Sequence, residues 1–258
     1  MIRVLALGDI VGTEAISVLK QQLWKQRTQW QVDFVVANGE NATDIHGLCA
    51  RDAQLILDCG VDVITLGNHT YSFRDLYPFL EEHPDSIIRP ANYPPECPGC
   101  GYTVRDVCGY RLLCINVNGT VFIDALANPF DTVSHILERE AEKYDLALLD
   151  IHAEATSEKL ALARVFDGRI TAMFGTHTHV ATADEQILPR GSGYITDLGM
   201  TGPTDGILGT DAETVITKFR THMPQRFTVA QGPIRACGAL FEIDPDAGKC
   251  LSVRRVTF

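Results

Sequence analysis

The sequence lacks the features that would place the protein in a membrane or on a secretory route. None of its apolar runs approaches the roughly 20 residues that a helix needs to cross a bilayer. The first seven residues, MIRVLAL, have the pattern of a strand and lack the long apolar core and small-residue cleavage site of a signal peptide. We therefore expect a cytoplasmic protein with no membrane partner.

Positive charge is also scarce. The chain has 22 Lys and Arg against 33 Asp and Glu, which gives a formal net charge of −11. A protein that follows a long stretch of nucleic acid needs clustered basic residues, so this class is excluded. A small anionic substrate remains compatible with the charge if a metal ion supplies local positive charge.

Cysteine pairs of the zinc-binding type are nearly absent. Of the eight cysteines, Cys97 and Cys100 alone form a C-x-x-C pair, which is at best half of a zinc site. A turn at Pro98 and Gly99 with incidental thiols is the interpretation that we favour. The other cysteines are scattered through apolar segments, as expected for buried thiols in a reducing compartment.

What the sequence does contain is an alternation of apolar strands and amphipathic helices. The patterns predict strands at 2–7, 33–37, 61–66, 146–151 and 170–174, and helices at 13–30, 51–59, 73–81, 132–144 and 157–166. A hairpin is expected at 101–117, and from residue 184 onward short strands and loops lead to two alternating runs, 235–243 and 251–258.

These elements predict an α/β fold, a four-layer α-β-β-α sandwich of two mixed sheets flanked by helices. The 258 residues are enough for one large domain, and no repeat, low-complexity tract or linker divides them. We therefore expect residues 1–258 to form a single domain. The sequence leaves open whether the protein forms a homo-oligomer.

Polar residues with metal-binding side chains follow five of the predicted strands. They are Asp9, Glu40, Asn41, Asn68, His69, His152, His177 and His179. The carboxyl ends of strands in α/β sheets gather at one edge, where ligands bind, so these residues should converge. The last two form an H-x-H pair that can turn both imidazoles toward one centre.

The chemistry of this set indicates a metal site. It offers carboxylate, amide and imidazole ligands without thiolate, which suits iron, manganese, zinc or nickel. There are too many ligands for one ion, whereas two ions with Glu40 bridging would use them all. Each residue alone also has an ordinary explanation as a helix cap, a turn residue or a buried histidine. His46 is either near the substrate or a solvated loop residue, and His83, His135 and His222 are expected on the surface.

The motifs GDIVG, NGEN, GNH, DIHAEATSEK, GTHTHV and YITDLGMTG carry a family resemblance over essentially the whole chain. The sequence resembles the calcineurin-like metallophosphoesterases and, more narrowly, their bacterial YmdB-type branch, which is described as cyclic-nucleotide phosphodiesterases with two irons. The wider superfamily begins with D-x-H, whereas here Ile10 and Val11 follow Asp9. The YmdB-type branch shares this change and the bridging Glu.

The resemblance implies a role for each residue. The first ion would be held by Asp9, Glu40 and His179, and the second by Glu40, Asn68, His152 and His177. Asn41 would be a further ligand, and His69 would be the catalytic proton donor.

The expected function is a dinuclear-metal-dependent phosphodiesterase that hydrolyses 2′,3′- or 3′,5′-cyclic nucleotides. A metal-bridging hydroxide would attack phosphorus, and His69 would protonate the leaving oxygen. A phosphomonoesterase acting on nucleotides or phosphoproteins, and a non-catalytic regulatory protein stabilised by metal, remain alternatives.

Two further features each have two interpretations. Asp150 is either an orienting partner of a ligand histidine or a cap. The loop 196–202 either lies near the site or is an ordinary turn.

Overall fold

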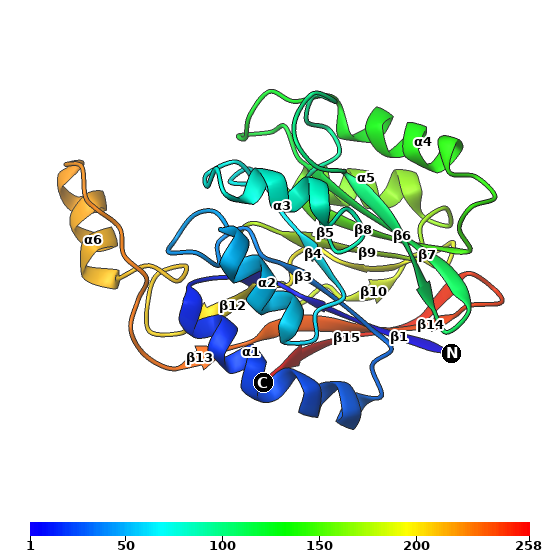
Figure 1. Ribbon diagram of the computed structural model, residues 1–258, viewed down its shortest axis with the longest axis horizontal. Helices are drawn as coiled ribbons and strands as arrows, with labels where there is room; N and C mark the ends of the chain where they lie inside the picture. Colours follow the sequence, from blue (N-terminus) through cyan, green and yellow to red (C-terminus); the bar gives the residue numbers. More distant parts are fainter.

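The computed structural model describes residues 1–258 and contains six helices, two six-stranded sheets and a small three-stranded sheet (Figure 1). The first sheet has the order β15-β14-β1-β3-β4-β5. Its strands are β1 (Ile2–Leu7), β3 (Phe34–Asn38), β4 (Val63–Thr65), β5 (Ile87–Ile88), β14 (Cys237–Asp244) and β15 (Lys249–Thr257). Because β1 pairs in parallel with β3 and antiparallel with β14, this sheet is mixed.

The second large sheet has the order β10-β11-β9-β8-β7-β6. Its strands are β6 (Tyr102–Val107), β7 (Tyr110–Asn118), β8 (Leu146–His152), β9 (Ala172–Thr176), β10 (Gln186–Ile187) and β11 (Gly193–Ile195). The third sheet joins β13 (Ile234–Arg235), β12 (Met200–Pro203) and β2 (Asp9–Ile10). The β6–β7 hairpin is antiparallel, whereas β7, β8 and β9 are parallel neighbours, so the second sheet is also mixed.

The helices mostly follow the predicted pattern. They are α1 (Thr13–Trp30), α2 (Ala50–Asp58), α3 (Leu76–Glu82), α4 (Pro129–Arg139), α5 (Thr156–Phe166) and α6 (Ala212–Thr221). Helix α4 begins three residues earlier than predicted, because Asn128 caps it by accepting a hydrogen bond from the Phe130 amide, with Pro129 at the first helical position. It also ends five residues earlier, before Glu142 adopts a positive φ.

Helix α6 contradicts the prediction of short strands and loops after residue 184. It is capped by Asp211, whose side chain accepts a hydrogen bond from the Thr214 amide at 2.9 Å. Val215 is its one buried residue, so the helix does not bury the apolar stripe on which periodicity arguments depend.

Three hydrophobic clusters form the interior. The first combines residues of α1 and α2 with residues of the first sheet, and the third combines residues of α4 and α5 with the second sheet. The second cluster contains residues of both sheets, including Phe174 of β9 and Phe241 of β14, whose ring centroids lie 6.2 Å apart. Figure 1 shows α1 and α2 on one side of the strands and α4 and α5 on the other. The predicted α/β class with mixed sheets is confirmed.

The helices and the cysteines bear on two further expectations. No helix is both long enough and apolar enough to cross a membrane. All eight cysteines are free, and the group of side chains that could share a metal ion contains neither Cys97 nor Cys100. The positive φ of Gly99 between them agrees with the turn that we favoured.

The cluster shared by the two sheets should carry much of the stability. Replacing the buried Phe241 by Ala should lower the free energy of unfolding by about 3–5 kcal/mol, because it removes apolar contacts and leaves a cavity. The matched control is Phe122→Ala, whose ring is 89% exposed and which should change stability by less than about 0.5 kcal/mol. Denaturant unfolding measures both, and equal losses would contradict the assignment of this core.

Candidate metal centre

The polar residues that follow separate strands meet at one place. Asp9 begins β2 just after β1, Glu40 follows β3, Asn68 follows β4, His152 ends β8 and His177 follows β9. Strands β1, β3 and β4 run parallel to one another, as do β8 and β9, so the carboxyl ends within each group lie together. Gly67 makes room for this convergence, because a Cβ atom there would collide with the Glu40 and His152 side chains.

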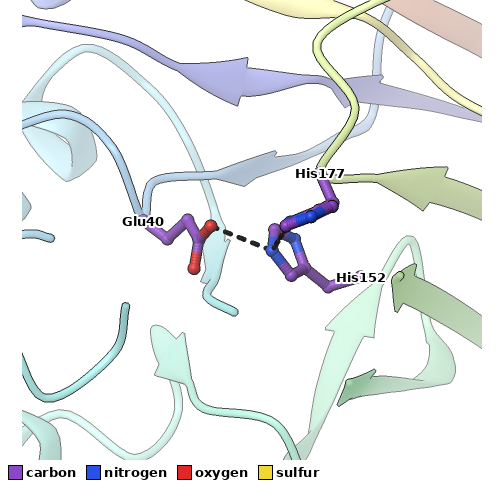
Figure 2. Close-up of side chains that lie close together, drawn as sticks. All are labelled: Glu40, His152 and His177. Atoms are coloured by element: carbon purple, nitrogen blue, oxygen red, sulfur yellow. Dashed lines mark hydrogen bonds and ion pairs between the residues drawn. The ribbon is translucent and has the colours of Figure 1, made fainter. Parts of the chain in front are cut away.

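Four donor atoms face one another at the centre of this region. His152 Nε2 lies 2.9 Å from Glu40 Oε1 and 3.1 Å from Asn68 Oδ1. It also lies 3.1 Å from His177 Nδ1. Figure 2 shows the Glu40 carboxylate and the His177 ring both next to the His152 ring. Glu40, His152 and His177 each offer a ligand atom within 4.8 Å of the others, which is the spacing of a metal-binding group.

A second set of predicted residues adjoins the first. Asp9 Oδ2 accepts a hydrogen bond from the His177 amide at 3.0 Å, and Asp9 Oδ1 lies 3.8 Å from His179 Nε2. Asn41 Nδ2 lies 3.2 Å from the same His179 nitrogen. Asp9 Oδ1 and Asn41 Oδ1 are buried and have no hydrogen-bond partner. Buried oxygens without partners are costly in a folded protein, and a bound cation would satisfy both.

His69 lies at the edge of the cluster. Its amide donates to Glu40 Oε2 at 3.0 Å, and its ring Nε2 lies 3.2 Å from Asn68 Nδ2. The His46 ring stacks on the His69 ring, with centroids 4.3 Å apart, so the structure places His46 beside the cluster. The structure therefore brings all eight predicted site residues together and adds His46.

Hydrogen bonds behind the cluster determine which ring nitrogens can bind a cation. The Thr176 hydroxyl donates to Asp150 Oδ1 at 2.7 Å, so its oxygen accepts a hydrogen bond from His152 Nδ1 at 2.9 Å. His179 Nδ1 likewise donates to the Leu208 carbonyl at 3.0 Å. In the neutral rings, both assignments leave Nε2 without a proton and directed into the cluster, which is the usual arrangement of metal-binding histidines. Asp150 thus orients His152 through Thr176.

The pKa values of Glu40 and His152 indicate that the cluster favours a proton or a cation between its side chains. Burial alone would raise the pKa of Glu40, but His152 and His69 lower it to about 2. Burial lowers the pKa of His152, but Glu40, Asp9 and Asp150 outweigh this effect and raise it to about 9. A buried carboxylate and a buried imidazole in contact therefore need a positive charge between them.

Burial and nearby charges also shift the pKa values of the neighbouring groups. Burial and the positive charge of His152 lower the pKa of His177 to about 3, so its ring is neutral and able to bind a cation. Burial raises the pKa of Asp9 above its usual value. Burial also raises the pKa of Asp150 to about 6, although its hydrogen bonds from Thr65 and Thr176 oppose this shift. The donor set thus fits a divalent cation.

Sequence reasoning missed the buried ion pair that supports the H-x-H loop. Lys159 Nζ lies 2.7 Å from Asp197 Oδ2 and also donates to the Thr176 carbonyl. Asp197 Oδ2 accepts from the amide and the hydroxyl of Thr178, at 3.2 and 2.9 Å. Thr178 lies between His177 and His179, which adopt positive φ values of 98° and 64°. The ion pair therefore stabilises a loop conformation that is strained for residues other than glycine.

The motifs DIHAEATSEK and YITDLGMTG contain Lys159 and Asp197, so the signal was present in the sequence. No spacing rule connects a lysine on a helix with an aspartate 38 positions later, and the pair becomes visible only in three dimensions. The same holds for Thr65 and Thr176, whose contacts with Asp150 have no local sequence signal. The loop 196–202, for which two interpretations were open, does lie beside the site through Asp197.

A cavity of about 390 Å³ opens onto the cluster. Glu40, Asn41, His69, His177 and His179 line one part of it, so the candidate ligands are accessible to a small molecule.

Curated relatives of this mixed α/β chain are named phosphodiesterase or phosphatase, so the class of protein is a phosphoric ester hydrolase. The family model described as YmdB-like protein matches residues 5–256, and the chain belongs to this YmdB-like family.

Individual relatives agree with this assignment. The chain is 42% identical to a Bacillus subtilis (strain 168) protein named 2′,3′-cyclic-nucleotide 2′-phosphodiesterase, over 98% of this chain and 96% of the relative. A crystal structure of a hypothetical protein from Thermus thermophilus has a TM-score of 0.93 and 40% identity, covering 100% and 99% of the two chains. A crystal structure of a phosphatase from Mycoplasma pneumoniae has the same TM-score with 32% identity, covering 100% and 93%.

The buried ion pair gives a test of how the site is supported. Replacing Lys159 by Met should cost about 3–5 kcal/mol of unfolding free energy, because the Asp197 carboxylate stays buried without its cation. The matched control is Lys143→Met. Lys143 is 64% exposed, and its partner Glu140 keeps Tyr102 and Arg139 as further partners, so the loss should be no more than about 1 kcal/mol. Denaturant unfolding decides, and similar losses for the two variants would show that the buried pair has no special role.

Proposed function

We propose that the protein is a metal-dependent phosphodiesterase that hydrolyses cyclic nucleotides, with 2′,3′-cyclic nucleotides as the favoured class and 3′,5′-cyclic nucleotides as a further possibility. The observation that carries the proposal is the buried contact between Glu40, His152 and His177, whose donor atoms face one another. The name of the Bacillus subtilis relative supports the substrate class.

We propose that two cations are held by the residues predicted from the sequence. Asp9, Glu40 and His179 would bind the first, and Glu40, Asn68, His152 and His177 would bind the second, with Asn41 as a further ligand. Iron is the first choice, and manganese, zinc or nickel would suit the same ligands. When bound, such a pair supplies polarisation of the phosphoryl oxygens and acidifies water toward a pKa of about 7.

The chain's own residues would then complete the reaction. The leaving group is a ribose oxygen, which departs slowly unless it receives a proton. His69 would donate this proton, because it borders the cavity and its backbone is anchored to Glu40 by the 3.0 Å hydrogen bond. His46 would limit the motion of the His69 ring by stacking on it.

We also propose that residues 1–258 form a single domain with four layers in the order α-β-β-α. The three hydrophobic clusters support this arrangement, because each combines elements that would be adjacent layers.

The second candidate function is a phosphomonoesterase, which the name of the Mycoplasma pneumoniae structure favours. Comparing bis-nitrophenyl phosphate with nitrophenyl phosphate separates the two. A diesterase should prefer the first compound, whereas faster hydrolysis of the second would favour the monoesterase.

The proposed ligands should control metal content and activity together. Asp9→Ala and His177→Ala should each lower both the bound metal, measured by elemental analysis of the purified protein, and the turnover of cyclic AMP isomers. His135→Ala is the matched control, because this histidine lies on α4 and bonds only to the Asp131 carbonyl. Full metal content and turnover in both site variants would contradict the ligand assignment.

The proton-donor role of His69 predicts a different result. His69→Ala should retain metal but lose roughly 10²- to 10⁴-fold in kcat on a cyclic nucleotide. The loss should largely disappear with bis-nitrophenyl phosphate, because nitrophenolate leaves without a proton. An equal loss with both substrates would remove His69 from proton transfer.

A further inference from the structure

The excursion that carries α6 contributes a second wall to the cavity beside the cluster. This excursion, residues 204–233, leaves the small sheet after β12 and returns at β13. Strand β12 pairs with β2, where Met200 lies opposite Asp9, so the excursion is anchored next to a candidate ligand. Figure 1 shows α6 standing apart from the sheets and the other helices.

The residues that this excursion places on the cavity are mostly apolar. They are Ile207, Leu208, Thr210, Val215, Lys218, Phe219 and Phe227. The other wall is formed largely by the polar residues of the cluster, so the cavity has one side suited to a phosphate and another suited to a flat apolar group. The hydrogen bond from His179 Nδ1 to the Leu208 carbonyl, 3.0 Å long, holds the two walls together.

Two aromatic side chains of this wall are accessible to a ligand. Phe219 is 73% exposed and Phe227 is 39% exposed, although most large apolar side chains of the protein are buried. Exposed phenylalanine rings beside a candidate catalytic centre are suited to stacking on a nucleobase, because every base presents a π-face. Stacking also makes few demands on base identity.

The charge of this wall supports an anionic ligand. Lys218 is the one lysine or arginine that lines the cavity, in a protein with a formal net charge of −11. It precedes Phe219 on α6, and it adds positive charge on the apolar side, where an anionic ligand would otherwise meet none.

We infer that Phe219 and Phe227 form the nucleobase subsite of this centre, with the phosphate of the same ligand at the Glu40–His177 cluster. This inference rests on the proposed cyclic-nucleotide phosphodiesterase function, and it makes Phe219 and Phe227 specificity-determining residues. Such a subsite selects nucleoside cyclic phosphates over cyclic phosphates without a base, and it discriminates little among the four bases.

The test compares two substrates that differ only in the base. These are 2′,3′-cyclic AMP and the 2,3-cyclic phosphate of methyl riboside, and the readout is the ratio of their kcat/KM values. Phe219→Ala should lower this ratio by roughly 5- to 150-fold, mainly through KM for the nucleotide. Phe219→Trp should restore it, because an indole ring also stacks, whereas Phe219→Leu should not. Phe227→Ala should act in the same direction.

The matched control is Ile216→Ala. Ile216 lies on the same helix and is 40% exposed, but it does not line the cavity, so the ratio should stay at the wild-type value. An unchanged ratio in Phe219→Ala and Phe227→Ala would overturn the inference. Phe219→Ala could instead change the molar mass of the protein in light scattering and leave the ratio unchanged. The ring would then belong to a protein interface, and the inference would again be wrong.

Failure of the proposed function can be distinguished from failure of the subsite. If the wild-type protein hydrolyses neither substrate, binding of AMP by equilibrium dialysis decides. Binding that is weakened in Phe219→Ala but normal in Ile216→Ala would support the subsite without the reaction. Binding that is equal in both variants, or absent from the wild-type protein, would refute it.

Discussion

The contact between the Glu40 carboxylate and the His152 imidazole is the interaction on which the rest of this structure depends. The two side chains are almost fully buried and 2.9 Å apart, and His152 Nδ1 is already engaged by Thr176. A buried carboxylate that faces a ring nitrogen without its own proton is unstable unless a positive charge lies between them. The pKa of His152, raised to about 9 by Glu40, Asp9 and Asp150, reflects this demand for a proton, and a divalent cation would meet the same demand.

The fold supplies this contact by bringing strand ends of two sheets together, and it then restrains the loops that follow. The loop of His177 and His179 requires two positive φ values, which Asp197 stabilises through Thr178. Asp197 is in turn neutralised by Lys159 from α5. The stability of the protein and the geometry of the candidate site are therefore linked, because the same buried ion pair serves both.

Much of the fold and of the candidate site could be predicted from the sequence, because hydrophobic periodicity and the residues that follow each strand are local patterns. The helix 13–30 has matching bounds in the structure, since its buried residues Ala15, Ile16, Leu19 and Leu23 follow helical spacing. The convergence of the site residues followed from the rule that parallel strand ends share an edge, without any knowledge of distances. Helix α6 was missed because it buries little, and the Lys159–Asp197 pair was missed because it joins segments with no pattern in common. The solvent exposure of a helix and the pairing of distant side chains depend on the folded chain, so local sequence patterns do not reveal them.

The central claim, that this cluster holds cations, is tested most directly by anomalous X-ray diffraction from crystals of the purified, active protein. The account predicts an anomalous peak within about 2.0–2.3 Å of donor atoms of Glu40, His152 and His177, at the absorption edge of the bound element, with a second peak beside Asp9 and His179. Active crystals without an anomalous peak in the cluster would contradict it.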